Sequence, residues 1–280
     1  MGANLNNGEV AETNRKLLSI VIPVLNEAGN VEPLCDAIRN TMQLLLARYD
    51  YEVIFTDNHS TDGTFAKLTQ MGNKDPRIKV VRFSRNFGYQ LSILAGFARS
   101  KGDAAIQIDS DFQDPPDLIP EFVRLWENGN QVVYGIRRSR KESRWITGAR
   151  RMFYRFVDIL SEDNLPHDAG DFRLVDRRIL EELKQIEDPQ PYLRGTIASI
   201  GFNQVGVPYD RGARASGESK FGFCEMLRLA LNGIFNHSIV PLRIASFTGF
   251  GVAFLTFLLS LTYVVQKLFV GEDWPAGFTT

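Results

Sequence analysis

Four aspartates crowd into one short stretch, QIDSDFQDPPD, which runs from Gln107 to Asp117. Asp109 and Asp111 come directly after an apolar run, at the point where a strand is expected to end. Carboxylates held this close repel one another, and a divalent cation relieves the repulsion. Mg²⁺ takes a few carboxylates together with waters and phosphate oxygens. The pair therefore predicts a site for a metal ion and a diphosphate, although a D-x-D triplet alone is also typical of a turn.

Two further acids in this stretch, Asp114 and Asp117, flank the pair Pro115 and Pro116. Aspartate favours turns and helix N-caps, and proline is favoured in the first turn of a helix. We therefore interpret these two acids as a turn and the beginning of the next helix, separate from the metal pair.

The turns after the first two expected strands are polar but lack a phosphate-binding glycine pattern. The first, IPVLNEAGN, places Asn26 and Glu27 where they could meet a nucleobase. The second, TDNHSTDGT, places Asp57 where it could accept from a base N–H, with a capped loop alone as the structural alternative. Neither G-x-G-x-x-G after the first strand nor G-x-x-x-x-G-K is present, which argues against a dinucleotide dehydrogenase or a P-loop NTPase.

These polar groups need a scaffold that brings separate strand ends together. Strand-like apolar runs are expected at residues 17–24, 51–56, 78–83, 103–108 and 131–136. Helical patterns lie between them, over residues 31–47, 64–71, 89–99 and 118–127. This alternation predicts an α/β fold, a Rossmann-like, mainly parallel sheet with helices on both faces and ligands beyond the carboxyl ends of the strands. The polar turns then meet at one edge of the sheet.

The last part of the sequence is apolar. Residues 244–265 form a run of 22 residues without a charge, long enough to cross a hydrocarbon layer of about 30 Å. Arg243 and Lys267 suit the two interfaces of such a span. The run predicts a transmembrane helix, with a buried core helix as the alternative. The preceding residues, 221–240, are amphipathic and predict interfacial helices.

Composition and charge narrow the function classes. The 280 residues are 44% hydrophobic and 23% charged, as in core-forming proteins, and the formal net charge of -1 gives no indication of nucleic-acid binding. Cys35 and Cys224 lack the spacing of a disulfide framework or a zinc site. The stretch 137–155 is basic and predicts either a solvated helix face or a surface for phosphate or lipid headgroups.

Seven motifs, taken together and in order, resemble those of a known family: VIPVLNE, TDNHSTDGT, FSRNFGYQ, DSDFQDPP, YGIRRSR, DAGDFRL and GESKF. They look like family 2 glycosyltransferases of GT-A fold, and more narrowly like the branch that moves a sugar from a nucleotide onto polyprenyl or dolichyl phosphate. The resemblance covers residues 17–270. It implies a metal-dependent, inverting hexosyltransferase that makes a lipid-linked sugar for cell-envelope glycans. UDP-glucose is the first choice of donor and undecaprenyl phosphate the acceptor.

The same resemblance assigns roles to individual residues. Those that would line the nucleoside pocket are Pro23, Asn26, Glu27 and Asp57. Those that would hold Mg²⁺ or Mn²⁺ with the diphosphate are Asp109, Asp111 and Gln113. Arg137 and Arg138 would meet phosphate, Asp171 and Arg173 would border the sugar and acceptor, and Ser219 with Lys220 would close the site. Asp171 is expected either to act as a base or to orient the sugar or a lysine.

The sequence departs from the family pattern in two places. The second-strand motif is more often D-D-G-S, and Asn58 and His59 replace its second Asp and its Gly, a change in the base and ribose contacts. Anchored members usually carry two C-terminal helices, whereas this sequence ends at Thr280 after one. We therefore expect a truncated or an atypical anchor.

The resemblance also predicts the domain organisation. The expected segments are a disordered tail at 1–16, a GT-A catalytic domain at 17–220, interfacial amphipathic helices at 221–242, a transmembrane helix at 243–270 and a tail at 271–280. Membrane lipid is an expected partner, and the basic residues place the catalytic domain on the cytoplasmic side of the inner, or plasma, membrane. A homo-oligomer is expected by analogy with anchored relatives.

Three alternative functions remain at this stage. A dolichyl-phosphate mannose synthase-like enzyme would use GDP-mannose. A processive polysaccharide synthase would carry a Q-x-x-R-W segment and more spans, and the sequence contains neither. A non-catalytic nucleotide-sugar-binding membrane protein would not need both Asp109 and Asp111.

Overall fold

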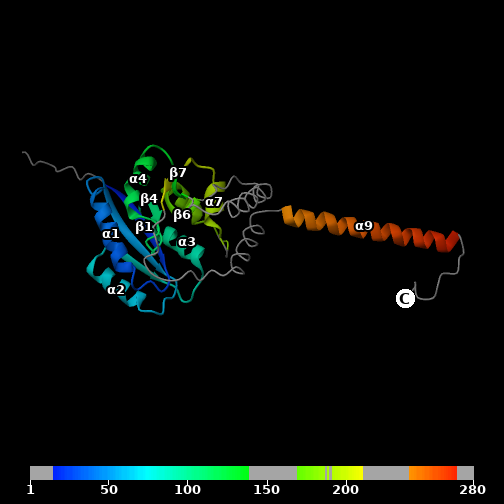
Figure 1. Cartoon of the computed structure of the whole chain (residues 1–280), viewed down its shortest axis with the longest axis horizontal. Coiled ribbons are helices and arrows are strands. Elements are labelled where there is room, and N and C mark those ends of the chain that lie inside the picture. The colour runs from blue at the N-terminus through cyan, green and yellow to red at the C-terminus, as the bar shows by residue number, and fades with distance from the viewer. Residues whose placement is uncertain (1–14, 139–168, 187, 189–190, 211–239, 270–280) are drawn as a thin grey trace, which may run out of the picture. The chain divides into compact units, whose positions relative to one another are not determined.

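The structure is a computed structural model that describes residues 15–138, 169–186, 188, 191–210 and 240–269 (Figure 1). The chain divides into two compact units. The first comprises residues 1–143 with 165–219, and the second comprises 144–164 with 220–280. The expected tails at 1–16 and 271–280 and the expected interfacial helices at 221–242 lie almost entirely outside the described residues.

The first unit is built on a seven-stranded sheet with the order β3-β2-β1-β4-β6-β5-β7. Its strands are β1 (Lys16–Val24), β2 (Tyr49–Asp57), β3 (Ile78–Arg82), β4 (Ala104–Gln107), β5 (Val132–Arg137), β6 (Ala169–Asp176) and β7 (Gln204–Tyr209). Strand β6 runs antiparallel to both of its neighbours, β4 and β5, and the other pairs are parallel. The predicted α/β fold and its first five strands are confirmed, whereas β6 and β7 are strands that the sequence pattern did not indicate.

Helices cover both faces of this sheet. They are α1 (Val31–Gln43), α2 (Thr64–Lys74), α3 (Tyr89–Arg99), α4 (Ile119–Glu127), α6 (Arg177–Leu183) and α7 (Leu193–Ser199), with a 3₁₀ turn, η1, at Pro116–Leu118. One core cluster joins the sheet to α1 and α4, and a second joins its other face to α3, α6 and α7. Figure 1 shows α1 and α3 on opposite sides of β1.

The alternation of side chains along β1 explains why two cores form. Leu18, Ile20 and Ile22 belong to the first cluster, and Val21 belongs to the second. Successive side chains of a strand point to opposite faces, so one apolar strand supplies both layers. On the second face a Cβ added to Gly96 would lie 2.2 Å from Val21 Cγ1, so only glycine permits α3 to approach β1 this closely.

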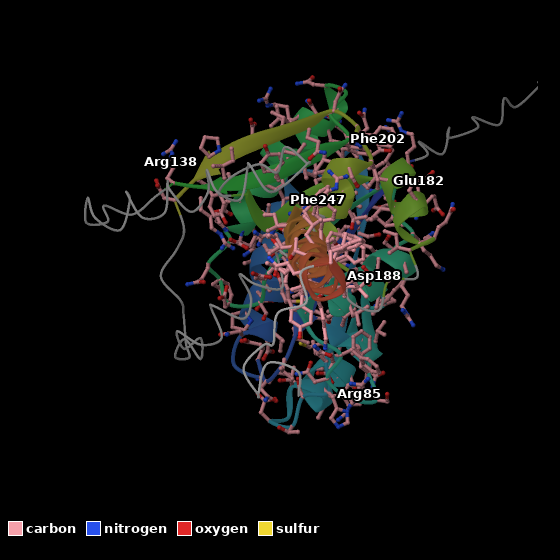
Figure 2. All side chains as sticks on the ribbon, turned by 90° about the vertical axis from the view of Figure 1, so that its right-hand side faces the viewer. Arg85, Arg138, Glu182, Asp188, Phe202 and Phe247 are labelled. Atoms are coloured by element: carbon pink, nitrogen blue, oxygen red, sulfur yellow. The ribbon has the colours of Figure 1, made fainter. Side chains whose placement is uncertain are left out.

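Strands β5 and β7 form the outer edge of the sheet in parallel register, with Val132 opposite Gln204 and Arg137 opposite Tyr209. Figure 2 shows Arg138 and Phe202 at opposite ends of this strand pair. Arg138 thus follows the carboxyl end of β5. The carboxyl ends of β1, β2 and β4 lie on this same side of the sheet.

The second unit contains, among its described residues, helix α9 (Val240–Phe269). Its segment Leu242–Phe269 has 28 residues and contains an 18-residue window with a mean hydropathy of 1.9. At a rise of 1.5 Å per residue, such a helix spans about 42 Å, which exceeds the thickness of a hydrocarbon core. From Leu242 to Phe269 every side chain except that of Tyr263 is exposed, and Figure 2 shows Phe247 among them. The expected long apolar helix is confirmed, and its insertion in a membrane stays a prediction.

Candidate active site

The loops at the carboxyl edge of the sheet contain strained backbone. In the described part of the chain, three residues other than glycine have positive φ: Asn26 at 57°, His59 at 69° and Phe112 at 61°. They follow β1, β2 and β4, respectively. Left-handed backbone at non-glycine residues is costly and gathers at functional sites. This edge of the sheet is therefore the candidate active site, as the sequence predicted.

The turns after β1 and β2 hold each other in place. The amide of Asn26 donates to Ser60 Oγ at 2.9 Å, and the Asn26 side-chain oxygen accepts from the amide of Thr61 at 2.8 Å. The amide of Glu27 donates to Thr64 Oγ1 at 2.9 Å. The Glu27 carboxylate also accepts from the side-chain amide of Asn30 at 2.6 Å, so it is oriented before any ligand arrives.

Asp57 lies at the end of β2 and is fully buried. Its Oδ1 accepts from the amide of Ser60 at 2.9 Å. Its Oδ2 makes no hydrogen bond within the described residues, and Arg82 Nε is the nearest cation at 3.6 Å. A buried carboxylate oxygen without a donor is costly, and an incoming N–H of a ligand would satisfy it. Pro23, which is buried in β1, lies one strand away in register with Thr56.

Asn58 and His59, the two departures from the family pattern, both bond to the segment that follows β3. Asn58 Oδ1 accepts from the amide of Phe87 at 2.9 Å. His59 Nδ1 lies 3.1 Å from the carbonyl oxygen of Phe83. These residues therefore connect two neighbouring loops of the site and stabilise the ends of β2 and β3 together.

The acidic pair lies in the loop after β4. Gln107, the last residue of β4, donates from Nε2 to Asp109 Oδ1 at 3.1 Å and to the Tyr89 hydroxyl at 3.0 Å. The Tyr89 hydroxyl in turn donates to Asp109. Asp111 Oδ1 accepts from the amide of Gln113 at 3.1 Å, which closes the turn. Both carboxylates of the pair are therefore oriented by donors from the end of β4, from their own loop or from the beginning of α3.

Negative charge accumulates around Asp109. Burial, followed by the charge of Asp114, raises the pKa of the Asp109 carboxyl to about 7. Asp171 and Asp111 raise this pKa further, and the hydrogen bond from Tyr89 opposes the rise. Such a region is stabilised by a bound cation.

The donor set fits a hard divalent cation. Within the described ranges, no three His, Cys, Asp or Glu side chains are arranged to hold a metal ion by themselves. Two carboxylates are nevertheless what Mg²⁺ commonly takes from a protein when substrate phosphates and waters complete its shell. Carboxylate and water oxygens also suit Mn²⁺. Asp109 and Asp111 are thus the residues that could hold such an ion, with the partly exposed Gln113 next to them.

Asp114 has a different role from the one predicted. It is not the N-cap of the next helix; η1 begins after Pro115, and no side chain caps it. Instead Asp114 is fully buried, accepts from the Tyr209 hydroxyl and lies 3.7 Å from Arg137 Nη2. Asp117 is exposed and accepts from Thr41 Oγ1 on α1 at 3.3 Å. The predicted helix start is confirmed for Asp117, which lies in η1, whereas the prediction for Asp114 was wrong because it considered only local chain geometry.

The two expected phosphate contacts lie at the end of β5. Arg137 Nε donates to the Tyr209 hydroxyl at 3.3 Å, so Asp114 and Tyr209 together hold the Arg137 guanidinium. Arg138 is exposed and pairs with Asp210 at 3.4 Å. Arg137 is therefore oriented inside the site, and Arg138 lies at its margin.

Asp171 and Arg173 enter from β6. Because β6 is antiparallel to β4, with Arg173 opposite Gln107, Asp171 extends beyond that pair to the level of Asp109. Arg194 on α7 contacts both Asp171 oxygens, Nε to Oδ1 at 2.8 Å and Nη2 to Oδ2 at 2.6 Å. Burial alone would raise the pKa of Asp171, but the hydrogen bonds and charge of Arg194 lower it below its ordinary value, assisted by Arg173 and Arg137.

Three side chains of this site were not predicted from the sequence. They are the side chains of Tyr89, Tyr209 and Arg194. Tyr89 stands in the FGYQ motif, which was the only available signal for it. Ser219, Lys220 and the basic stretch beyond Arg138 lie outside the described residues.

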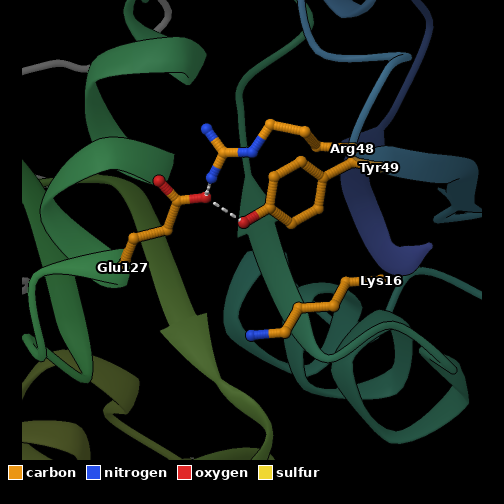
Figure 3. A pocket seen from close by; sticks show the side chains of 4 residues that line it. All are labelled: Lys16, Arg48, Tyr49 and Glu127. Atoms are coloured by element: carbon orange, nitrogen blue, oxygen red, sulfur yellow. Dashed lines mark hydrogen bonds and ion pairs between the residues drawn. The ribbon is translucent and has the colours of Figure 1, made fainter. Parts of the chain in front are cut away.

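A separate cavity of about 420 Å³ lies at the opposite edge of the sheet (Figure 3). It is lined by Lys16, Arg48, Tyr49 and Glu127, and Glu127 already accepts from both Arg48 and Tyr49. Lys16 and Tyr49 begin β1 and β2, so this cavity is at the amino ends of the strands, away from the acidic pair. Ligands of open parallel sheets bind at the carboxyl ends, so we do not assign the activity here.

The structure thus combines a mainly parallel α/β sheet with an acidic pair and oriented arginines at the carboxyl ends of its strands. The sequence profile of Glycosyl transferase family 2 matches residues 19–184. The chain is 37% identical over 252 residues to the uncharacterized glycosyltransferase YkcC of Bacillus subtilis, covering 90% of this chain and 77% of that one. It is 31% identical over 256 residues to the bactoprenol glucosyl transferase of Shigella phage SfV, covering 91% and 83%.

Solved structures share the fold. Glucosyl-3-phosphoglycerate synthase from Mycobacterium tuberculosis, in complex with Mn²⁺, UDP and phosphoglyceric acid, matches with a TM-score of 0.51 and 21% identity over 78% of each chain. Mannosyl-3-phosphoglycerate synthase from Rubrobacter xylanophilus matches with a TM-score of 0.52 and 18% identity over 82% of this chain and 74% of that one. The chain belongs to glycosyl transferase family 2 and has the GT-A fold. The predicted family is confirmed.

Proposed function

We propose that this glycosyltransferase moves a hexose from a nucleotide sugar to polyprenyl phosphate with inversion at the anomeric carbon. UDP-glucose is the donor and undecaprenyl phosphate the acceptor in this proposal. The observation that carries it is the meeting of the acidic pair, Asp109 and Asp111, with the held guanidinium of Arg137 at one edge of the sheet. The long apolar helix α9 and the 31% identity to a bactoprenol glucosyl transferase support the lipid acceptor.

The donor nucleoside would bind between the turns after β1 and β2. Asp57 Oδ2 would accept from a base N–H, which would satisfy this buried oxygen. The oriented carboxylate of Glu27 and the backbone around Asn26 would complete the nucleoside pocket, with Pro23 behind them. The existing bonds among these turns mean that little conformational entropy is lost on binding.

The diphosphate would lie beside Asp109 and Asp111. A bound Mg²⁺ or Mn²⁺ supplies charge neutralisation for the departing nucleoside diphosphate. Within the chain, Gln107 and Tyr89 fix the Asp109 carboxylate, and the amide of Gln113 fixes Asp111. These bonds position the two acids before the substrate arrives. Groups that are already oriented stabilise the charge of a transition state most effectively.

The acceptor phosphate would be oriented by Arg137, with Arg138 at the margin and Lys220 and Ser219 closing the site. A phosphate monoester is largely dianionic near neutral pH, with a second pKa of about 6, so it needs little help from a general base. Positioning and charge neutralisation then dominate the rate. Asp171 would border the sugar together with Arg173.

A membrane location follows from the acceptor. Polyprenyl phosphate is confined to the bilayer, and α9 would anchor the catalytic domain in the plasma membrane beside it. The basic stretch 137–155 and Arg243 favour a cytoplasmic catalytic domain. Association of several copies, by analogy with anchored relatives, belongs to the same proposal.

The deciding experiment supplies membranes containing the full chain with radiolabelled UDP-glucose, GDP-mannose or other nucleotide sugars and undecaprenyl phosphate. We expect label from UDP-glucose to become extractable with the lipid. Asp109→Ala should abolish this, and Asp36→Ala should not, since Asp36 is exposed on α1 and pairs only with Arg39 among the described residues. If GDP-mannose alone labels the lipid, the donor is GDP-mannose and not UDP-glucose. Nucleotide-sugar binding without transfer to any lipid would refute the enzyme proposal.

A further inference from the structure

The contact between Arg194 and Asp171 is the most specific polar contact of the site that the proposed roles leave unexplained. Two parallel hydrogen bonds, at 2.8 and 2.6 Å, join the guanidinium to the carboxylate. The Asp171 side chain is 13% exposed and that of Arg194 is 34% exposed. A bidentate arginine–carboxylate pair fixes the carboxylate plane as well as its charge.

The position of Arg194 is built into the fold. Its neighbours Leu193 and Ile197 are 3% and 0% exposed and belong to the second core cluster. The amide of Leu193 donates to Gln90 Oε1 on α3 at 3.2 Å. Helix α3 begins at Tyr89, whose hydroxyl donates to Asp109. The first residue of α7 is thus connected to α3, the element that orients Asp109, so Arg194 is not a freely moving surface side chain.

The other groups around Asp171 do not replace this contact. Arg173 Nη2 is 3.9 Å from Asp171 Oδ1, and it donates to the Gly170 carbonyl at 3.0 Å instead. The positive charge of Arg137, on β5, lowers the pKa of Asp171. Asp109, in the loop after β4, has the opposite charge and repels Asp171. Tyr89 on α3 also interacts electrostatically with Asp171. Among the described groups, only Arg194 bonds to both carboxylate oxygens.

We propose that Arg194 is a positioning residue that holds Asp171 as an ionised acceptor for hydroxyl groups of the donor hexose. This inference rests on the proposed transfer reaction. A carboxylate has about four acceptor sites, and the fork uses two of them, so sites remain for sugar hydroxyls. A carboxylate held in this way serves to orient the sugar and does not need to take a proton from the acceptor.

The consequence is that Arg194 acts through Asp171. Removing a hydrogen-bonded partner of a charged group costs about 1.5–3 kcal/mol, which corresponds to a roughly 10- to 150-fold loss in kcat/KM. We expect Arg194→Gln to cause a loss in this range, with the KM for the nucleotide sugar raised more than that for undecaprenyl phosphate. Arg194→Lys keeps the charge without the fork, so it should recover part of the activity and show that the variant protein folds.

A double-mutant cycle tests this directly. If Arg194 acts only through Asp171, the variant Asp171→Asn with Arg194→Gln should be no less active than Asp171→Asn alone, within about twofold. If Arg194 has an independent role, such as binding the acceptor phosphate, the two losses should multiply, and the inference is overturned. A pH–rate profile of Arg194→Gln should gain a new acidic limb, because the buried Asp171 carboxyl loses the group that favours its ionised form.

Matched controls separate this result from general destabilisation. Arg178→Gln breaks another arginine–aspartate pair of β6, that with Asp176 at 3.0 Å, at the far end of the strand. It should leave kcat/KM and the pH profile unchanged. A urea-denaturation cycle of Arg194 and Asp171 detects their coupling even without turnover, and a coupling of zero would overturn the inference.

Failure of the proposed function gives a different result. In that case the wild type labels no lipid with any nucleotide sugar, and the positioning role fails with it. An active wild type with multiplying losses overturns the positioning role alone.

Discussion

Replacement of Tyr209 with phenylalanine should destabilise the first unit, because it removes a hydroxyl from a buried acid while keeping the ring. Tyr209 is 4% exposed, and its hydroxyl donates to Asp114, which is 0% exposed. Burial, followed by the charge of Asp114, raises the pKa of Tyr209, so the hydroxyl stays protonated near neutral pH. The ring packs edge-on against Phe172 with centroids 6.1 Å apart, a contact that phenylalanine retains. The substitution therefore removes the two hydrogen bonds of this hydroxyl, the one it donates to Asp114 and the one it accepts from Arg137 Nε, and leaves the ring contact in place.

The magnitude follows from the charge of the acceptor. A hydrogen bond to a charged group contributes about 1.5–3 kcal/mol. Arg137 stays within 3.7 Å of Asp114 and still compensates part of its charge, so we expect a loss of about 2 kcal/mol in the free energy of unfolding. In a domain of this size, that loss lowers Tm by roughly 4–8 °C.

The assay compares thermal and urea denaturation of the full wild-type chain in detergent with Tyr209→Phe and a control, Tyr51→Phe. Tyr51 is 6% exposed, and its hydroxyl has no hydrogen-bond partner among the described residues. Its replacement should therefore cost much less. Tyr209→Phe should also raise the KM for undecaprenyl phosphate, because Arg137 loses the hydroxyl that its Nε contacts at 3.3 Å. Equal stability of the two variants would refute the assignment of a charged, hydroxyl-bound Asp114.

Three further predictions concern the acidic pair Asp109 and Asp111, Asp171, and the buried structural acid Glu52. Asp109→Ala or Asp111→Ala should lower turnover by at least about 10³-fold, and EDTA should do the same to the wild type until Mg²⁺ or Mn²⁺ is restored; near-normal turnover of either purified variant would remove the metal role. Asp171→Asn should lose much less than these variants, and loss of all pH dependence in its rate would instead identify a general base. Burial alone would raise the pKa of Glu52, but hydrogen bonds from Lys79, Ser19 and the amide of Lys101 lower it below its ordinary value of 4.5. Because the folded-state pKa is the lower one, Glu52 stabilises the protein above about pH 4.5 and loses this effect as pH falls through the folded value. The difference in unfolding free energy between wild type and Glu52→Gln, from urea denaturation at several pH values, should therefore shrink below that pH, and a constant difference would contradict the assignment.

The sequence by itself determined the alternating elements, the end of the sheet where the polar turns meet and the apolar C-terminal helix. These features depend on local periodicity and on the rule that parallel strands present their carboxyl ends together. Asp57 at the end of β2 and Asp109 with Asp111 after β4 could be placed in this way. Their chemistry is also local, because two close carboxylates repel whatever surrounds them.

Only the tertiary structure decided which distant residues complete the site. The pattern of apolar and polar residues along β6 does not reveal that this strand runs antiparallel between β4 and β5. This direction brings Asp171 to the level of Asp109. Likewise the contacts of Asp114 with Tyr209 and of Asp171 with Arg194 join residues 95 and 23 positions apart. The physical reason is that strand order and direction are chosen by burial over the whole sheet, so the partner of a buried charge is set by packing that no short stretch of sequence contains.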